Sequence, residues 1–129
     1  MSYVVELTKQ AADEFNRLSM GSSKFRILLE KALYELENLE LQNAINLQEV
    51  KVLSGIEKQT KNNLKLIGFS PLLFEYRNFP KSFPVRIVFT ISKDETRILI
   101  WAIYHHKDMN QSKFMKSLSS RVKNRKTAE

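Results

Sequence analysis

Residues 85–108 read VRIVFTISKDETRILIWAIYHHKD, and the rest of the fold is organised around this stretch. Apolar residues occupy every second position of its first half, the pattern of a strand with one face in the core: Val85, Ile87, Phe89 and Ile91. Ser92–Glu95 holds turn-forming residues, so we expect a hairpin. Ile98–Tyr104 is apolar on both sides, which is typical of a central strand.

Upstream of this hairpin the pattern changes from strand to helix. Tyr3–Leu7 is rich in β-forming residues and predicts a strand. Thr8 can cap the helix that follows, because its hydroxyl can accept a hydrogen bond from an early helical N–H. The apolar positions of this helix repeat at helical spacing: Ala11, Ala12, Phe15 and Leu18. After a break at Gly21–Ser23, a second helix begins near Lys24 with its own stripe: Phe25, Leu28, Leu29, Ala32, Leu36 and Leu39.

The middle of the chain is less regular. Val50–Leu53 precedes Gly55, which indicates a short apolar element that ends in a turn. Glu57–Lys65 is polar and basic, and we predict an exposed loop there. Leu72–Phe79 predicts a strand, and Pro80–Pro84 predicts a rigid connection to the hairpin.

A last helix is predicted over Asn110–Arg125, with Phe114, Leu118 and Val122 along one side, followed by a frayed tail at Lys126–Glu129. The order of strand, two helices, three strands and a helix is typical of the α+β class. Strands joined by short links pair antiparallel, and the first strand can join only at the sheet edge or beside the last strand. We expect the helices to lie on one face.

The composition fits one domain over residues 1–129, and the absence of cysteine excludes disulfides and thiolate metal sites. The net charge of +7 is unevenly distributed. Residues 1–50 hold 5 Lys and Arg against 8 Asp and Glu, and residues 51–129 hold 16 against 6, so the balances are −3 and +10. Such asymmetry indicates an anionic partner for one face, unless the basic surface is merely solvated.

No segment predicts export or membrane insertion. Residues 1–6 lack the charged-then-apolar build of a signal peptide, and no apolar run approaches the roughly 18 residues of a membrane span. We therefore expect a cytoplasmic protein that engages no membrane.

Familiar catalytic motifs are absent from the sequence. It contains no P-loop, zinc-ligand spacing, dinucleotide fingerprint or serine nucleophile elbow. The adjacent His105 and His106 would point to opposite sides of a continuing strand, which makes them poor joint metal ligands. We expect neither a metal nor a cofactor.

Strand pairing should instead bring basic side chains to one end of the sheet. Arg77 ends the strand before the hairpin, Arg86 starts the next, and His106 and Lys107 end the last. Adjacent antiparallel strands place the end of one beside the start of the next, so Lys107 should emerge where Arg86 enters. The alternative is that the arginines merely pair with carboxylates such as Glu75.

Five motifs follow one another over about residues 3–110: Tyr3–Thr8 with Ala11, Phe15 and Leu18; Leu53–Gly55; Leu73–Arg77; Pro84–Phe89; and Ile103–Asp108. In order and approximate spacing they resemble the RelE/ParE superfamily of bacterial and archaeal toxins. The resemblance implies a twisted antiparallel sheet with two N-terminal helices packed on one face and a C-terminal helix. It also implies pairing with a cognate antitoxin, which we expect to be small and acidic.

The RelE branch of this superfamily implies an activity. Its toxins cleave messenger RNA in the ribosomal decoding site without a metal, and basic residues position phosphate and help move protons. The resemblance marks four catalytic candidates: Arg86, His106, Lys107 and Arg77. We add four basic residues as RNA-binding candidates: Lys81, Lys113, Lys116 and Arg121. The expected partners are the ribosome and messenger RNA.

Some residues depart from the family pattern. Glu75 stands where the best-known RNase members carry lysine, and Lys107 replaces an arginine, which loses planar bidentate contact with phosphate. No tyrosine follows Asp108, and the segment Gly55–Leu72 is longer than usual. Two further interpretations therefore stay open: a ParE-like inhibitor of DNA gyrase, and a catalytically degenerate member that only binds an antitoxin or nucleic acid.

Overall fold

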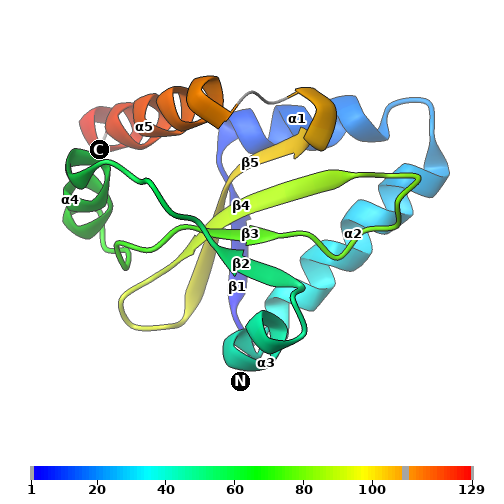
Figure 1. Ribbon diagram of the computed structural model, residues 1–129, viewed down its shortest axis with the longest axis horizontal. Helices are drawn as coiled ribbons and strands as arrows, with labels where there is room; N and C mark the ends of the chain where they lie inside the picture. The colour runs from blue at the N-terminus through cyan, green and yellow to red at the C-terminus, as the bar shows by residue number, and fades with distance from the viewer. Residues whose placement is uncertain (1, 109–110, 129) are drawn as a thin grey trace.

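The computed structural model describes residues 2–108 and 111–128, and within them the backbone forms a five-stranded sheet in the order β1-β5-β4-β3-β2 (Figure 1). The strands are β1 (Val4–Leu7), β2 (Val50–Val52), β3 (Phe74–Tyr76), β4 (Val85–Ile91) and β5 (Arg97–His105). The predicted hairpin is confirmed as β4 and β5, and β5 is central, between β1 and β4.

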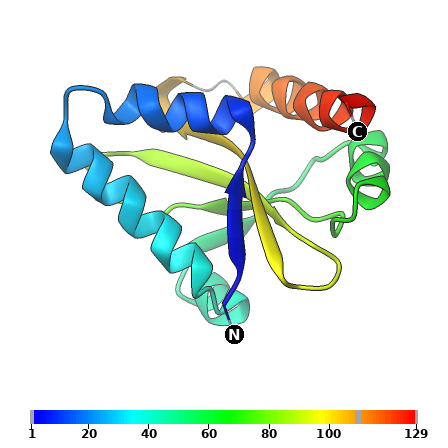
Figure 2. The ribbon, with the colours of Figure 1, turned by 180° about the vertical axis from the view of Figure 1, so that it is seen from behind.

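The sheet is mixed, which corrects the expectation of a purely antiparallel one. β2, β3, β4 and β5 pair antiparallel in succession, but β1 pairs with β5 in parallel (Figure 2). Only strands joined by short links are constrained to pair antiparallel, and β1 is separated from β5 by most of the chain. Its place at the edge beside the last strand agrees with the sequence.

The helices are α1 (Lys9–Ser19), α2 (Ser23–Glu37), α3 (Leu41–Asn46), α4 (Lys58–Leu66) and α5 (Gln111–Ala128). The predicted cap is confirmed, since the Thr8 hydroxyl accepts a hydrogen bond from the Ala11 N–H at 3.2 Å. Gly21 adopts a φ of 73° between α1 and α2, a conformation that favours glycine. None of the helices in the described residues is long and apolar enough to cross a membrane.

Helices cover both faces of the sheet, so the expectation of a single covered face is wrong. One core packs α1–α3 against alternate residues of the hairpin, including Val85, Ile87 and Phe89. A second core packs α4 and α5 against the residues between them, including Val88 and Trp101. The physical reason is that the hairpin is apolar on both sides, and each apolar face has to be buried. We call these faces the α1–α3 side and the α4–α5 side.

The middle of the chain differs most from prediction. The predicted exposed loop over Glu57–Lys65 is wrong, because Lys58–Leu66 is helix α4. Its buried residues follow helical spacing but are largely polar: Thr60, Asn63 and Leu64. Thr60 Oγ1 donates to Ser119 Oγ of α5 at 2.9 Å. Contact with α5 therefore stabilises α4. Its buried side cannot be recognised from the sequence, because the residues on that side are largely polar.

Smaller differences concern boundaries. The strand predicted over Leu72–Phe79 is limited to β3, and α3 was not predicted. α5 carries Phe114, Leu118 and Val122 on its buried side, as predicted, but it continues to Ala128 through most of the expected frayed tail. The predicted helix start at Asn110 and the end of the tail at Glu129 lie outside the described residues.

A β-bulge interrupts the β4–β5 pairing. Val88 pairs with Ala102 and Phe89 with Ile100, so Trp101 is an extra residue on β5. The Trp101 side chain is fully buried and its Nε1–H donates to Thr90 Oγ1 at 2.9 Å. A bulge reverses the alternation of side chains beyond it. Residues of β5 after Trp101 therefore face the side opposite to the one that regular alternation would give them.

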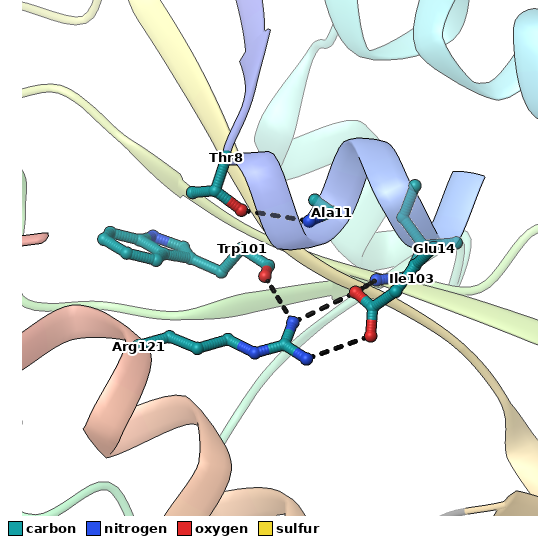
Figure 3. A network of polar contacts seen from close by, with 6 residues as sticks. All are labelled: Thr8, Ala11, Glu14, Trp101, Ile103 and Arg121. Atoms are coloured by element: carbon teal, nitrogen blue, oxygen red, sulfur yellow. Dashed lines mark hydrogen bonds and ion pairs between the residues drawn. The ribbon is translucent and has the colours of Figure 1, made fainter. Parts of the chain in front are cut away.

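Glu14 of α1 and Arg121 of α5 bind the backbone at this bulge (Figure 3). Arg121 Nη1 donates to the Trp101 carbonyl at 2.9 Å, and the Ile103 N–H donates to Glu14 Oε1 at 3.0 Å. The two side chains also form a bidentate ion pair, Nη1 to Oε1 and Nη2 to Oε2, both at 3.0 Å. The network satisfies backbone groups where β1 no longer pairs with β5, and it joins α1 and α5 across the sheet edge.

This network predicts a large stability loss from a small change. Arg121→Gln should lower the free energy of unfolding by about 2 to 3 kcal/mol, because it leaves the mostly buried Glu14 carboxylate without its ion partner. Arg26→Gln is the matched control, since Arg26 pairs with Glu30 at 3.0 Å on an exposed helix surface, and it should cost less than about 0.5 kcal/mol. Urea unfolding measures both, and equal losses would contradict the structural role of the network.

Candidate functional site

A cavity of about 220 Å³ opens on the α4–α5 side of the sheet, where the hairpin ends and α5 begins. Its lining combines polar side chains from three strands and the 3-10 turn after β5 with apolar side chains from neighbouring segments: Lys51, Leu53, Glu75, Tyr104, His106, Phe114 and Met115. We call it the site cavity. Strands β2, β3 and β5 thus each contribute to one hollow that can accept a small polar group.

Glu75 lies at the centre of the polar contacts. Its Oε2 accepts a hydrogen bond from the Tyr104 hydroxyl at 2.8 Å, and its Oε1 lies 3.5 Å from Arg86 Nε. The Glu75 side chain is 12% exposed. Tyr104 of β5 and Arg86 of β4 thus contact the two oxygens of this β3 carboxylate. The carboxylate keeps lone pairs that no described contact uses.

Arg86 has the position that the sequence predicts, at the start of β4 opposite Tyr104 of β5. Its Nη1 donates to the Val85 carbonyl at 3.2 Å and its Nε faces Glu75, at a separation too long for a good hydrogen bond. The pairing with Glu75 that the sequence left as an alternative is therefore present. A guanidinium has five N–H donors, so donors remain that an incoming phosphate could use.

The bulge at Trp101 determines which histidine reaches the cavity. Regular alternation from Ile98 and Ile100 would turn His105 toward Glu75, but the reversed alternation places His106 in the cavity lining. His105 pairs with Val85 in the sheet register, and its Nδ1 accepts a hydrogen bond from the Lys107 N–H at 3.2 Å. The strand ends at His105 and His106 begins the 3-10 turn that follows, and His106 is the histidine that lines the cavity with Glu75.

Of the four catalytic candidates, His106 lines the cavity, and Arg86 lies outside the lining with a 3.5 Å contact to Glu75. Lys107 and Arg77 also lie outside the lining. Lys107 is exposed in the 3-10 turn that follows β5, next to His106. The His106 N–H donates to the Pro84 carbonyl at 2.7 Å, so this turn emerges where Arg86 enters, as predicted. Arg77 lines a neighbouring hollow with Ile45 and the β2 strand.

The RNA-binding candidates divide into three groups. Lys113 and Lys116 are exposed on the first turns of α5, next to the cavity residues Phe114 and Met115. Lys81 is exposed in the β3–β4 connection, away from the cavity lining and close to Phe83, which stacks on Phe25 of α2. The Arg121 guanidinium is engaged by Glu14 and Trp101, so we leave it out of the proposed RNA-binding surface.

Three polar cavity residues were not selected from the sequence: Lys51, Glu75 and Tyr104. Glu75 was noted only as a departure from the family pattern and as a pairing partner for arginine. The sequence signal that could have selected Glu75 was its place two residues before Arg77, in the strand β3 that pairs with the Arg86 strand β4. Lys51 and Tyr104 carried no such signal, because strand register and the bulge determine where they point.

Burial raises the pKa of the Tyr104 phenol above its ordinary value, and the hydrogen bond to Glu75 and the negative charge of that carboxylate raise it further. Arg86 acts in the opposite direction. The phenol therefore stays protonated and donates to Glu75, which fixes the orientation of the carboxylate. In residues 2–108 and 111–128, no group of three or more His, Asp or Glu side chains is arranged to hold a metal ion.

No protein-family model matches this chain, and no curated protein matches it either. Two similar solved structures come from toxin–antitoxin complexes. A chain of the RelBE2 complex from Mycobacterium tuberculosis is 22% identical, with 82% of this chain and 100% of that chain covered and a TM-score of 0.45. A chain of the archaeal RelE–RelB complex from Pyrococcus horikoshii is 15% identical, with 84% and 100% covered and a TM-score of 0.48. At these sequence identities and TM-scores, the similarity is limited to the course of the backbone.

The Tyr104 contact predicts a specific pH dependence of stability. The folded state favours the neutral phenol. The stability that the Tyr104–Glu75 contact contributes is therefore present below the ordinary tyrosine pKa of about 10, and it is lost as the pH rises through the higher folded-state pKa. Tyr104→Phe should be less stable than wild type at pH 7 by about 1 kcal/mol, and its stability should fall less steeply above about pH 10.

Urea unfolding at a series of pH values measures this difference, with Tyr34→Phe on the exposed surface of α2 as the matched control. Parallel curves for wild type and Tyr104→Phe at alkaline pH would show that the phenol–carboxylate contact does not form.

Proposed function

We propose that this chain is the toxin of a type II toxin–antitoxin pair and that it cleaves messenger RNA on the ribosome without a metal. The observation that carries the proposal is that Glu75 and His106 line one cavity, while Arg86 contacts Glu75 at 3.5 Å from outside the lining. Together these side chains offer a proton acceptor, a fixed positive charge and a proton donor, the groups that RNA cleavage by its own 2′-hydroxyl requires. The five sequence motifs that resemble the RelE/ParE superfamily support the same function.

In the proposed reaction Glu75 takes the proton of a ribose 2′-hydroxyl as its oxygen attacks the neighbouring phosphorus. Arg86, assisted by Lys51, stabilises the extra negative charge on the phosphoryl oxygens, since its donors match phosphate geometry. The bond from phosphorus to the 5′-oxygen breaks, and protonated His106 gives its proton to that oxygen. The products are a 2′,3′-cyclic phosphate and a 5′-hydroxyl, so every proton and electron pair is accounted for.

The charge distribution fits this use of the cavity. Imidazole is the side chain suited to giving and taking protons near neutral pH, and His106 lies on the face that also carries the basic helices α4 and α5. Lys107 and Arg77 would extend the positive field around the substrate strand. The same basic face would attract a small acidic antitoxin, which we propose as the partner that holds the toxin inactive in the cytoplasm.

Removal of the central positive charge should abolish activity. Arg86→Ala should reduce cleavage of a ribosome-bound message by about a hundredfold or more, because one charge-stabilising donor in a site of this kind commonly contributes that much. Growth inhibition on expression should disappear with it, while the circular dichroism spectrum stays that of wild type. Arg17→Ala is the control, an exposed arginine on α1 that is outside the cavity lining.

Product chemistry tests the metal-free route in the same assay. The cut ends should carry a 5′-hydroxyl and a cyclic or 3′-phosphate, and a 2′-deoxynucleotide at the cut position should block cleavage. Full activity of Arg86→Ala, or 5′-phosphate products, would refute the proposed site. Inability of the wild type to cut, together with early arrest of DNA synthesis, would favour the gyrase-inhibitor interpretation.

The two proton-transfer residues should behave differently from their neighbours. His106→Ala should lose most of the activity and His105→Ala should keep it, because only His106 lines the cavity. Glu75→Gln should also lose cleavage, yet it should bind RNA at least as tightly as wild type, since it removes a negative charge beside Arg86. Cleavage rates on an unmodified message, and binding constants for a message with a 2′-O-methyl block at the cut position, separate the two effects.

Weaker RNA binding by Glu75→Gln with an unchanged cleavage rate would assign Glu75 to substrate binding only. If wild type and Glu75→Gln bind RNA equally and neither cuts it, the protein is a binding-only member of the superfamily.

A further inference from the structure

Helix α4 presents a row of lysines to solvent. Lys58, Lys61 and Lys65 are all exposed, and at 100° per residue they fall within one arc of the helix. Its other side, with Thr60 and Leu64, is buried against α5 and the sheet. We call the three residues the lysine stripe. The helix contains no acidic residue, so no carboxylate within α4 neutralises the stripe.

The stripe continues onto neighbouring segments. α4 lies beside α5 in both ribbon views (Figures 1 and 2), and α5 is also free of acidic residues. Lys93 in the turn between β4 and β5 reaches the end of α4, where its Nζ donates to the Lys65 carbonyl at 2.9 Å. Nearby carboxylates are at the margins: Glu57 before α4 and Asp94 and Glu95 in that turn.

The basic surface leads to the site cavity. Thr60 of α4 contacts Ser119 of α5, and Ser119 is five residues beyond the cavity residue Phe114, about 7.5 Å along the helix axis at about 1.5 Å per residue. Lys116 is exposed between Phe114 and Ser119, and Lys113 is exposed just before Phe114. A polyanion in contact with α4 can therefore extend over α5 to the cavity without leaving the basic face.

The opposite side of the sheet has a different charge. α2 and the turn after it carry Glu30, Glu35, Glu37 and Glu40 against Lys24, Arg26 and Lys31. The helices of that face are therefore close to neutral, in contrast to the basic helices α4 and α5. Lysines that served solubility alone would not need to gather on the face that holds the cavity.

We propose that the lysine stripe binds the phosphate backbone of RNA outside the site cavity, as a second contact that holds the substrate strand or its surrounding RNA. This inference deepens the proposed function, because it gives the long segment after β2 a role in RNA binding. RNA fits better than a membrane surface, since the exposed side of α4 is polar apart from Leu66 and lacks the apolar stripe that inserts into lipid.

The test replaces the stripe by Lys58→Gln, Lys61→Gln and Lys65→Gln together, a change that retains helix propensity. The control is Lys9→Gln, Lys24→Gln and Lys31→Gln, which removes the same charge from exposed positions on α1 and α2. Binding to a 2′-O-methyl RNA of about 20 nucleotides is measured over a range of salt concentrations, so cleavage does not enter. Circular dichroism confirms that both variants fold.

Loss of three phosphate contacts should make the slope of log K against log salt shallower by about 2 and weaken binding roughly a hundredfold near 0.1 M salt. The control should keep the wild-type slope. Equal slopes for wild type and the stripe variant would overturn the proposal, and so would equal losses in both variants. Binding of acidic phosphatidylserine vesicles that depends on the stripe, without RNA binding, would also overturn it. Salt-dependent RNA binding through the stripe by a protein that cuts nothing would uphold this inference while the proposed nuclease activity failed.

Discussion

The extra residue Trp101 in β5 is the constraint on which the arrangement of the site depends. A strand alternates its side chains between two faces, so one inserted residue exchanges the faces of everything that follows. Here it turns Tyr104 and His106 toward Glu75 and Arg86, and it keeps Ile103 in the core with α1–α3. The bulge is held by the Trp101 hydrogen bond to Thr90 and by the Glu14–Arg121 pair, which binds its free backbone groups.

The site itself balances one carboxylate against several cations. The Glu75–Arg86 contact at 3.5 Å is a loose pairing of two mostly buried side chains, where opposite charges attract more strongly than they do in water. In the proposed reaction a phosphate would compete with Glu75 for the guanidinium, and the carboxylate would then be available to the 2′-hydroxyl. The Tyr104 hydroxyl keeps the carboxylate in place during this exchange because it remains protonated.

The two covered faces of the sheet differ in packing and in charge. The α1–α3 side holds the larger apolar core and the acidic residues of α2, and its contacts fix the hairpin. The α4–α5 side holds the cavity, the basic helices and the polar Thr60–Ser119 contact. Arg121 shows that a basic residue on this side can belong to the internal structure, so positive charge alone does not identify a residue that binds RNA.

The sequence alone determined the hairpin, β1 with its Thr8 cap, both N-terminal helices and the apolar side of α5, because these depend on local periodicity and on capping chemistry. The order of its motifs also marked Arg86 and His106 as catalytic candidates, and their role stays a prediction. Helix α4 was missed because its inward face is polar and gains its stability from contact with α5. Only the tertiary structure decided the parallel pairing of β1, the placement of Lys51 and Glu75 in one cavity, and the internal role of Arg121. The reason is physical: these features depend on strand register, on one bulge and on contacts between residues far apart in the chain, and local sequence patterns do not encode them.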